Sequence, residues 1–181
     1  MATKINAIGR VAFIGCGAMG EAILKGILNA KLAAKTDLVA AVPTAQRREY
    51  LTKQYGIKTF ADNAEAVAEA DFVVLAVKPQ MAKTAITASL VKAIPAKATV
   101  VSIMSSIDLN MLHALVPKRA IVRVMPNTPL AVGEGMTAYC PDEKVAPEAL
   151  EKVDAMFSSS GEAIQVAETA MEAVSALSGC G

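Results

Sequence analysis

A glycine-rich segment near the N-terminus has the residue types that bind phosphate groups. It reads Gly15-Cys16-Gly17-Ala18-Met19-Gly20 and follows a run of four apolar residues, 11–14. Gly15 permits a tight turn, Gly17 lets a pyrophosphate approach the backbone, and Gly20 lets the next helix pack closely. The N-terminus of that helix offers free N–H groups and the positive end of its dipole. The pattern therefore predicts a dinucleotide site, and the alternative is a glycine-rich turn without a ligand.

The end of the second predicted strand bears on which dinucleotide binds. An acidic residue about 20 positions after the glycine motif would hydrogen-bond the ribose 2′-OH of NAD. Asp37 has that spacing, but it precedes the strand predicted over 38–42 and so lies at the opposite edge. The strand ends without an acid, and Arg47 and Arg48 follow. Arginine binds a 2′-phosphate through two parallel hydrogen bonds, so we expect NADP(H), with NAD(H) as the alternative. The sequence leaves open which arginine contacts the phosphate, or whether both are only solvated surface charges.

Three later segments also end predicted strands and so lie at the same edge of a parallel sheet. A candidate wall of the cofactor pocket is formed by Ala76, Val77, Lys78 and Pro79, although a charged loop before a proline has the same pattern. Small residues at 102–106 would admit a nicotinamide, or would simply cap the next helix. The third segment is a stiff turn, formed by Met125, Pro126, Asn127, Thr128 and Pro129. It is either a platform for substrate or nicotinamide, or only a turn.

Short β-branched runs alternate with alanine-rich helical stretches along the chain. This alternation predicts an α/β fold with a doubly wound, Rossmann-like and mostly parallel sheet. Asn63 is predicted to cap the helix that follows it. The expected strands are 11–14, 38–42, 58–60, 72–77, 99–103 and 121–125, with 136–139 as the last edge strand. The expected helices are 18–32, 45–55, 63–70, 108–115, 147–157 and 167–177.

Composition excludes several other classes of protein. The 181 residues are 54% hydrophobic and 19% charged, which is typical of a folded domain. Lys plus Arg number 18 and Asp plus Glu 17, and the net charge of +1 provides no basic field for nucleic acid. The three cysteines fit neither a disulfide framework nor a zinc spacing, and no apolar run approaches the ~20 residues of a membrane helix. We expect a cytoplasmic protein with no metal, nucleic-acid or membrane partner.

No residue of the chain is predicted to act as a catalytic acid, base or nucleophile. His113 is the only histidine, and its helix lies away from the predicted ligand edge. Cys16 occupies a position in the glycine loop that any small side chain would fit.

Four segments together resemble the pyrroline-5-carboxylate reductase family. They are FIGCGAMGEA (13–22), AVKPQ (76–80), VRVMPNTPLAVGEGMTAY (122–139) and AVSALSGCG (173–181). The resemblance implies hydride transfer from NADPH, or NADH in some members, to the C=N bond of the small-molecule substrate 1-pyrroline-5-carboxylate, which gives L-proline. It also implies a dinucleotide-binding domain over 1–167 and, over 168–181, the start of a helical domain that completes the substrate site and forms a homodimer or larger assembly.

The same resemblance implies that a set of residues in this chain contacts the cofactor. They are Ile14, Gly15, Cys16, Gly17, Ala18 and Met19 in the glycine loop, Val42 after the second strand, Asn63, and Ala76, Val77, Lys78 and Pro79. The chain departs from the family at 103–106, where an Ala-Gly type of sequence is usual. The bulkier Met104 is therefore expected either to crowd the nicotinamide or to alter the pocket.

Two other functions remain as alternatives. One is the nucleotide domain of an oxidoreductase similar to 3-hydroxyacid dehydrogenases, and the other is an NADP-binding protein without catalysis. Because family members continue well past Gly181, we expect this chain alone to be a weak catalyst at most.

Overall fold

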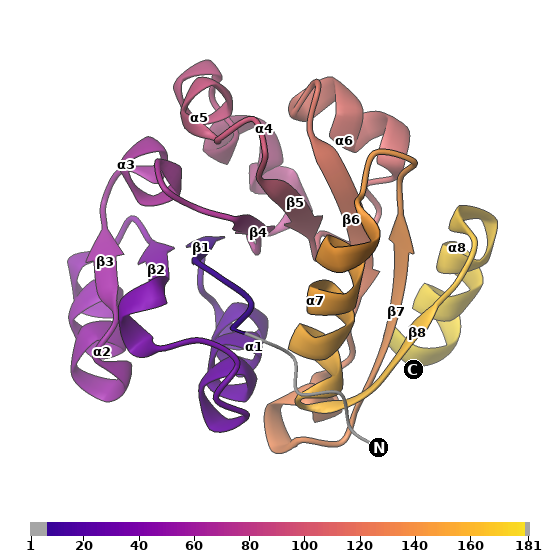
Figure 1. The fold of residues 1–181 in the computed structure, drawn as a ribbon, viewed down its shortest axis with the longest axis horizontal. Coiled ribbons are helices and arrows are strands. Elements are labelled where there is room, and N and C mark those ends of the chain that lie inside the picture. The colour runs from indigo at the N-terminus through magenta and orange to yellow at the C-terminus, as the bar shows by residue number, and fades with distance from the viewer. Residues whose placement is uncertain (1–6, 180–181) are drawn as a thin grey trace.

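Short apolar runs form the central strands of one sheet in a computed structural model, which describes residues 7–179. Its eight strands lie in the order β3-β2-β1-β4-β5-β6-β7-β8 (Figure 1). Neighbouring strands are parallel except β6 and β7, which are antiparallel. The strands are β1 (Val11–Ile14), β2 (Leu38–Ala41), β3 (Lys58–Phe60), β4 (Phe72–Leu75), β5 (Thr99–Ser102), β6 (Ala120–Met125), β7 (Gly135–Pro141) and β8 (Gly161–Gln165).

Helices cover both faces of this sheet (Figure 1). One face packs against α1 (Ala18–Asn29), α2 (Ala45–Tyr55) and α7 (Pro147–Ser158). The other packs against α3 (Asn63–Val67), α4 (Ala82–Ala85), α5 (Ala88–Ala93) and α6 (Leu109–Leu115). The last short helix, α8 (Met171–Val174), buries Met171 against β6 and β7. The doubly wound, mostly parallel α/β fold predicted from the sequence is therefore confirmed.

Side chains alternate between the two faces along each central strand. In β4, Phe72 and Val74 belong to the α1 side of the sheet, whereas Val73 and Leu75 belong to the α3 side. All four residues are buried. A parallel strand with a helical layer on each face needs apolar residues at every position, which is why this run shows no alternation in its sequence.

The position of β1 in the sheet creates the place where a ligand can bind. The chain leaves β1 through α1 to reach β2 on one side, and it later returns to β4 on the other side of β1. The connections after β1 and β4 therefore diverge at the carboxyl ends of these strands. Crevices at such switch points are the usual ligand sites of open α/β sheets.

Five local predictions were wrong. Strand β7 is not the edge strand, because β8 pairs beside it. Asp62, not Asn63, caps α3, since its Oδ1 accepts hydrogen bonds from the N–H groups of Ala64 and Glu65 at 2.7 and 3.1 Å. Helices α1 and α3 end at Asn29 and Val67, short of residues 32 and 70. The segment expected as one helix over 167–177 is a 3₁₀ turn, α8 and a π turn.

Parts of the predicted domains cannot be compared with the structure. Residues 1–6 of the predicted domain 1–167, and residues 180–181 of the predicted domain 168–181, lie outside the described residues. Among the helices of residues 7–179, none combines the length and the apolar character needed to cross a membrane.

Candidate functional site

A cavity of about 610 Å³ lies at the switch point between β1 and β4. Its walls are the glycine loop after β1, residues 41–44 at the end of β2, and residues 76–78 after β4. Met81, Thr84 and Ala85 line the side toward α4. Its size lies within the roughly 300–1,000 Å³ range of pockets that bind small molecules and cofactors.

Two glycines of the loop have opposite surroundings. Gly15 has a φ of +78°, and a Cβ atom there would lie 2.8 Å from Val77 Cγ1 and 2.9 Å from the Ala76 carbonyl oxygen. A Cβ on Gly17 would have no atom within 4 Å. Gly15 therefore lets the loop pass close to the end of β4, whereas Gly17 leaves open space at the start of α1.

The start of α1 is suited to bind a phosphate. Gly17 is its N-cap residue, and no side chain caps the first N–H groups of this twelve-residue helix. Such N–H groups, at the positive end of the helix dipole, are a common binding site for phosphate in dinucleotide-binding folds. The open loop and the uncapped helix together fit the pyrophosphate of a dinucleotide.

The structure brings most of the predicted cofactor residues together around this cavity. Those that line it are Gly15, Cys16, Gly17, Val42, Arg47, Asn63, Ala76, Val77 and Lys78. Those predicted residues that do not line it are Ile14, Ala18, Met19, Arg48 and Pro79. Ile14 is fully buried in the core, and its carbonyl oxygen accepts a hydrogen bond from the Ala76 N–H group at 2.9 Å. Met19 packs against the opposite core.

Among the lining residues that the sequence analysis missed, Thr44 and Ala85 differ in whether the sequence carries a signal for them. Thr44 is the N-cap residue of α2, and its hydroxyl makes no capping hydrogen bond to the helix. A Thr directly before a helix is a recognisable N-cap residue, so the sequence could have indicated its place at the start of α2. Ala85 also lines the cavity, and its carbonyl oxygen accepts a hydrogen bond from the Asn63 amide at 3.0 Å. No local sequence pattern predicts that contact, because 22 residues separate Asn63 from Ala85.

The two arginines after β2 occupy different environments. Arg48 donates from Nη1 to the carbonyl oxygens of Val42 and Pro43, both at 2.8 Å, and so holds the turn at the end of β2. Arg47 lines the cavity and donates from Nε to the Cys16 carbonyl oxygen at 2.9 Å. Of the two, Arg47 is the one whose guanidinium is at the cavity.

Burial makes the thiol of Cys16 unreactive. Its side chain is buried, and burial raises its pKa to about 12, although the positive charge of Arg47 opposes this rise. A thiol with so high a pKa is not a thiolate at neutral pH and is a poor nucleophile. The prediction that nothing marks Cys16 as a nucleophile is consistent with this environment.

The residues predicted for the nicotinamide and substrate end lie outside this cavity. Met104 does not line it, and its side chain is buried in the core on the α3 side of the sheet. The turn at 125–129 does not line this cavity. Within the turn, Asn127 accepts from the Met136 N–H group at 2.9 Å and donates to Ser178 Oγ at 3.2 Å. It therefore links β7 to the π turn over residues 175–179.

Groups able to hold a metal do not gather among residues 7–179. His113 Nε2 lies 3.2 Å from Asp142 Oδ2, away from the cavity.

Comparison with known proteins identifies the family. The model of the family described as "NADP oxidoreductase coenzyme F420-dependent" matches residues 10–106, more than half of the chain. The chain belongs to this family. The matched part runs from β1 to the turn after β5 and contains every wall of the cavity.

Pyrroline-5-carboxylate reductases resemble the chain over nearly its whole length. The chain is 38% identical to pyrroline-5-carboxylate reductase of Synechocystis sp. and 34% identical to that of Methanosarcina acetivorans. Each comparison covers 95% of this chain but 64% of the relative, so the chain spans about two thirds of these relatives' length. The resemblance predicted from four sequence segments is thereby confirmed.

Solved structures support the same relationship. The pyrroline carboxylate reductase of Plasmodium falciparum, solved with NADP bound, matches with a TM-score of 0.85 at 30% identity, over 97% of this chain and 64% of that one. The enzyme of Coxiella burnetii matches with a TM-score of 0.90 at 27% identity, over 96% and 65%. A 3-hydroxyisobutyrate dehydrogenase of Mycobacterium tuberculosis, at 19% identity and a TM-score of 0.72 over 91% and 57%, shares the fold alone.

Proposed function

We propose that this chain is the cofactor-binding part of an NAD(P)H-dependent reductase that converts 1-pyrroline-5-carboxylate to L-proline. The observation that carries the proposal is the cavity at the switch point, whose glycine loop and helix N-terminus suit a dinucleotide. Similarity to pyrroline-5-carboxylate reductases over 95% of the chain supports the choice of substrate. The assembly of the whole protein as a homodimer or larger, its helical domain from residue 168 onward and its cytoplasmic location belong to the same proposal.

The roles of the residues follow from their positions. The N–H groups after Gly17 would bind the pyrophosphate, and Thr44 and Arg47, which line the cavity at the end of β2, would contact the adenosine ribose. The strand end at 76–78 would direct the nicotinamide along the sheet edge. When bound, the reduced nicotinamide supplies a hydride. The protein's task is to hold it against the imine carbon, because a protonated imine is already a strong hydride acceptor.

The chemistry of the lining agrees with this simple task. Within residues 7–179, no His, Asp or Glu side chain lines the cavity. A reaction that needed a carboxyl or imidazole group as general acid or base beside the nucleotide would find none among these lining residues. Hydride transfer to an imine needs none at this wall.

The phosphorylated nucleotide fits the end of β2 better than NAD(H) does. The turn over residues 42–44 carries no acid to bind a ribose 2′-OH, and Arg47 contributes a positive charge to the cavity wall. A fluorescence titration of the chain with NADPH and with NADH measures this preference. We expect NADPH to bind about ten-fold more tightly, the order of one charge-assisted hydrogen bond. Equal affinities for the two nucleotides would show that Arg47 does not bind the 2′-phosphate. Failure to bind either nucleotide would contradict the dinucleotide site.

A chimera tests the reaction itself. The chain is joined at its C-terminus to the remaining part of the Synechocystis reductase, the relative that is 38% identical over 95% of this chain. We expect NADPH oxidation that depends on 1-pyrroline-5-carboxylate and yields L-proline. Retained NADPH binding shows that the chimera has folded. A folded chimera that makes no proline, or that instead oxidises a 3-hydroxy acid, would contradict the proposed substrate.

A further inference from the structure

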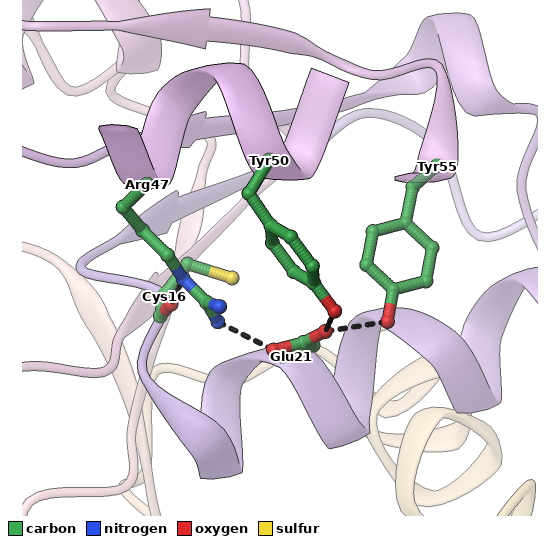
Figure 2. A network of polar contacts seen from close by, with 5 residues as sticks. All are labelled: Cys16, Glu21, Arg47, Tyr50 and Tyr55. Carbon is green, nitrogen blue, oxygen red and sulfur yellow. Dashed lines mark hydrogen bonds and ion pairs between the residues drawn. The ribbon is translucent and has the colours of Figure 1, made fainter. Parts of the chain in front are cut away.

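A polar cluster between α1 and α2 lies beside the cavity. Glu21 projects from α1, and Arg47, Tyr50 and Tyr55 point toward it from α2 (Figure 2). The Glu21 carboxylate accepts hydrogen bonds from all three. Arg47 donates from Nη2 to Oε2 at 2.5 Å, and the hydroxyls of Tyr50 and Tyr55 donate to Oε1 at 2.9 and 2.6 Å.

The two carboxylate oxygens of Glu21 have different hydrogen-bond partners. The tyrosine hydroxyls occupy Oε1, so Oε2 is left for Arg47. Only 18% of the Glu21 side chain is exposed. Burial raises the pKa of the Glu21 carboxyl, but the hydrogen bonds from Tyr55, Arg47 and Tyr50 outweigh it and leave the pKa below its ordinary value. The carboxylate therefore stays ionised at neutral pH and remains a partner for Arg47.

Arg47 is held on three sides. Its Nε bonds the Cys16 carbonyl oxygen, its Nη2 bonds Glu21, and its guanidinium lies over the Tyr50 ring, 5.0 Å from the ring centre. Within residues 7–179, these contacts engage Nε and Nη2 and leave Nη1 without a hydrogen bond. A guanidinium fixed along one edge keeps its other donors in a constant place, which reduces the entropy lost on binding a phosphate.

We propose that Glu21 is a positioning residue that sets the preference for the phosphorylated nucleotide by fixing Arg47 at the cavity wall. The inference rests on the proposed function, because it needs a dinucleotide in this cavity. Glu21 itself does not line the cavity, so it acts through Arg47. The ligand group recognised is the 2′-phosphate of the adenosine ribose, the part of NADP(H) that NAD(H) lacks.

A competing explanation is that Glu21 only neutralises Arg47 and weakens phosphate binding. The hydrogen bonds argue against it, because two hydroxyls and the guanidinium all donate to this one carboxylate and disperse its charge. The two explanations predict opposite results when the carboxylate is replaced.

The variant Glu21→Gln separates them. The amide oxygen of Gln can still accept from Tyr50 and Tyr55, but its NH₂ group cannot accept from Arg47. We expect the dissociation constant for NADPH to rise about ten-fold, the usual scale of a charge-assisted hydrogen bond, and that for NADH to change less than about two-fold. A rise in NADPH affinity would favour the neutralising explanation and overturn the proposal.

A double-mutant cycle with Arg47→Ala shows whether Glu21 acts through Arg47. In the Arg47→Ala background, Glu21→Gln should cause no further change in the ratio of NADPH to NADH affinity. A purely structural role would lower both affinities together and would persist in that background. Glu49→Gln, at an exposed position of α2, removes the same charge and should leave the ratio unchanged.

The outcomes remain distinct from those of the proposed function. If the unmodified chain binds neither nucleotide, the proposed function fails. If it prefers NADPH and Glu21→Gln, folded by circular dichroism, keeps the same ratio, the inference about Glu21 is wrong and the cofactor site stands.

Discussion

At the scale of single residues, two glycines of the same loop have different roles. Gly15 is required by the backbone, because its φ is +78° and the end of β4 lies too close for a Cβ atom. Gly17 has the ordinary φ of −77° and open space around it. The fold therefore requires glycine at Gly15, whereas at Gly17 it leaves open space, where we propose that the pyrophosphate binds.

This difference leads to a paired prediction. Gly15→Ala should lower the free energy of unfolding by roughly 2 kcal/mol or more, because the left-handed conformation alone costs about 1–2 kcal/mol and the contact with Ala76 adds to it. Gly17→Ala should change it by less than about 0.5 kcal/mol but weaken NADPH binding about ten-fold, because the methyl group fills the space a pyrophosphate needs. Urea unfolding and a fluorescence titration measure the two effects. Unchanged binding in a folded Gly17→Ala variant would place the pyrophosphate elsewhere.

At the scale of elements, the turn between β5 and α6 carries a local strain. Ser106 is exposed and adopts a φ of +63°, which a residue with a Cβ atom rarely does. The turn ends where Asp108 caps α6 by accepting from the Met111 N–H group at 2.7 Å. The conformation of Ser106 is therefore imposed by its neighbours, the strand end before it and the capped helix after it.

Ser106→Gly should stabilise the protein. We expect a gain of roughly 0.5–1 kcal/mol, because glycine adopts this φ without the steric cost, and its greater freedom in the unfolded chain offsets part of the gain. Ser105→Gly, one position earlier and without a positive φ, is the matched control and should be neutral or destabilising. Thermal denaturation compares the two. A loss of stability in Ser106→Gly would mean that the Ser106 side chain makes a contact worth more than the strain.

The elements also show which features a sequence can reveal. Strands β1 and β4 were predictable because their residues are uniformly apolar, as burial on both faces demands. Strand β8 was missed because Glu162, Ile164 and Gln165 are exposed there, and only backbone pairing with β7 defines the strand. The sequence predicted Arg47 and Arg48 as candidates but could not tell which of them lines the cavity, since the hydrogen-bond partners of Arg47, Cys16 and Glu21, are 31 and 26 residues away.

At the scale of the whole molecule, one ion pair joins the interior of the sheet to the C-terminal segment. Arg123 lies on β6 with 5% of its side chain exposed, and its Nη1 lies 2.5 Å from Oε1 of Glu168, in the 3₁₀ turn before α8. The same Glu168 oxygen accepts from the Leu109 N–H group at 3.3 Å, at the start of α6. Glu168 thus connects β6, α6 and the segment that carries α8.

Removing the charge of Glu168 should loosen that connection. Breaking a fully buried pair costs roughly 3–5 kcal/mol, and because a third of the Glu168 side chain is exposed we expect Glu168→Gln to cost about 2 kcal/mol. The double variant Arg123→Met/Glu168→Leu should recover most of this loss, since no buried charge is then left unpaired. Urea unfolding measures the stability, and hydrogen exchange in α8 reports whether the segment detaches first. If Glu168→Gln were as stable as the unmodified chain, with equal exchange in α8, the apolar contacts of Met171 alone would hold this segment to the sheet.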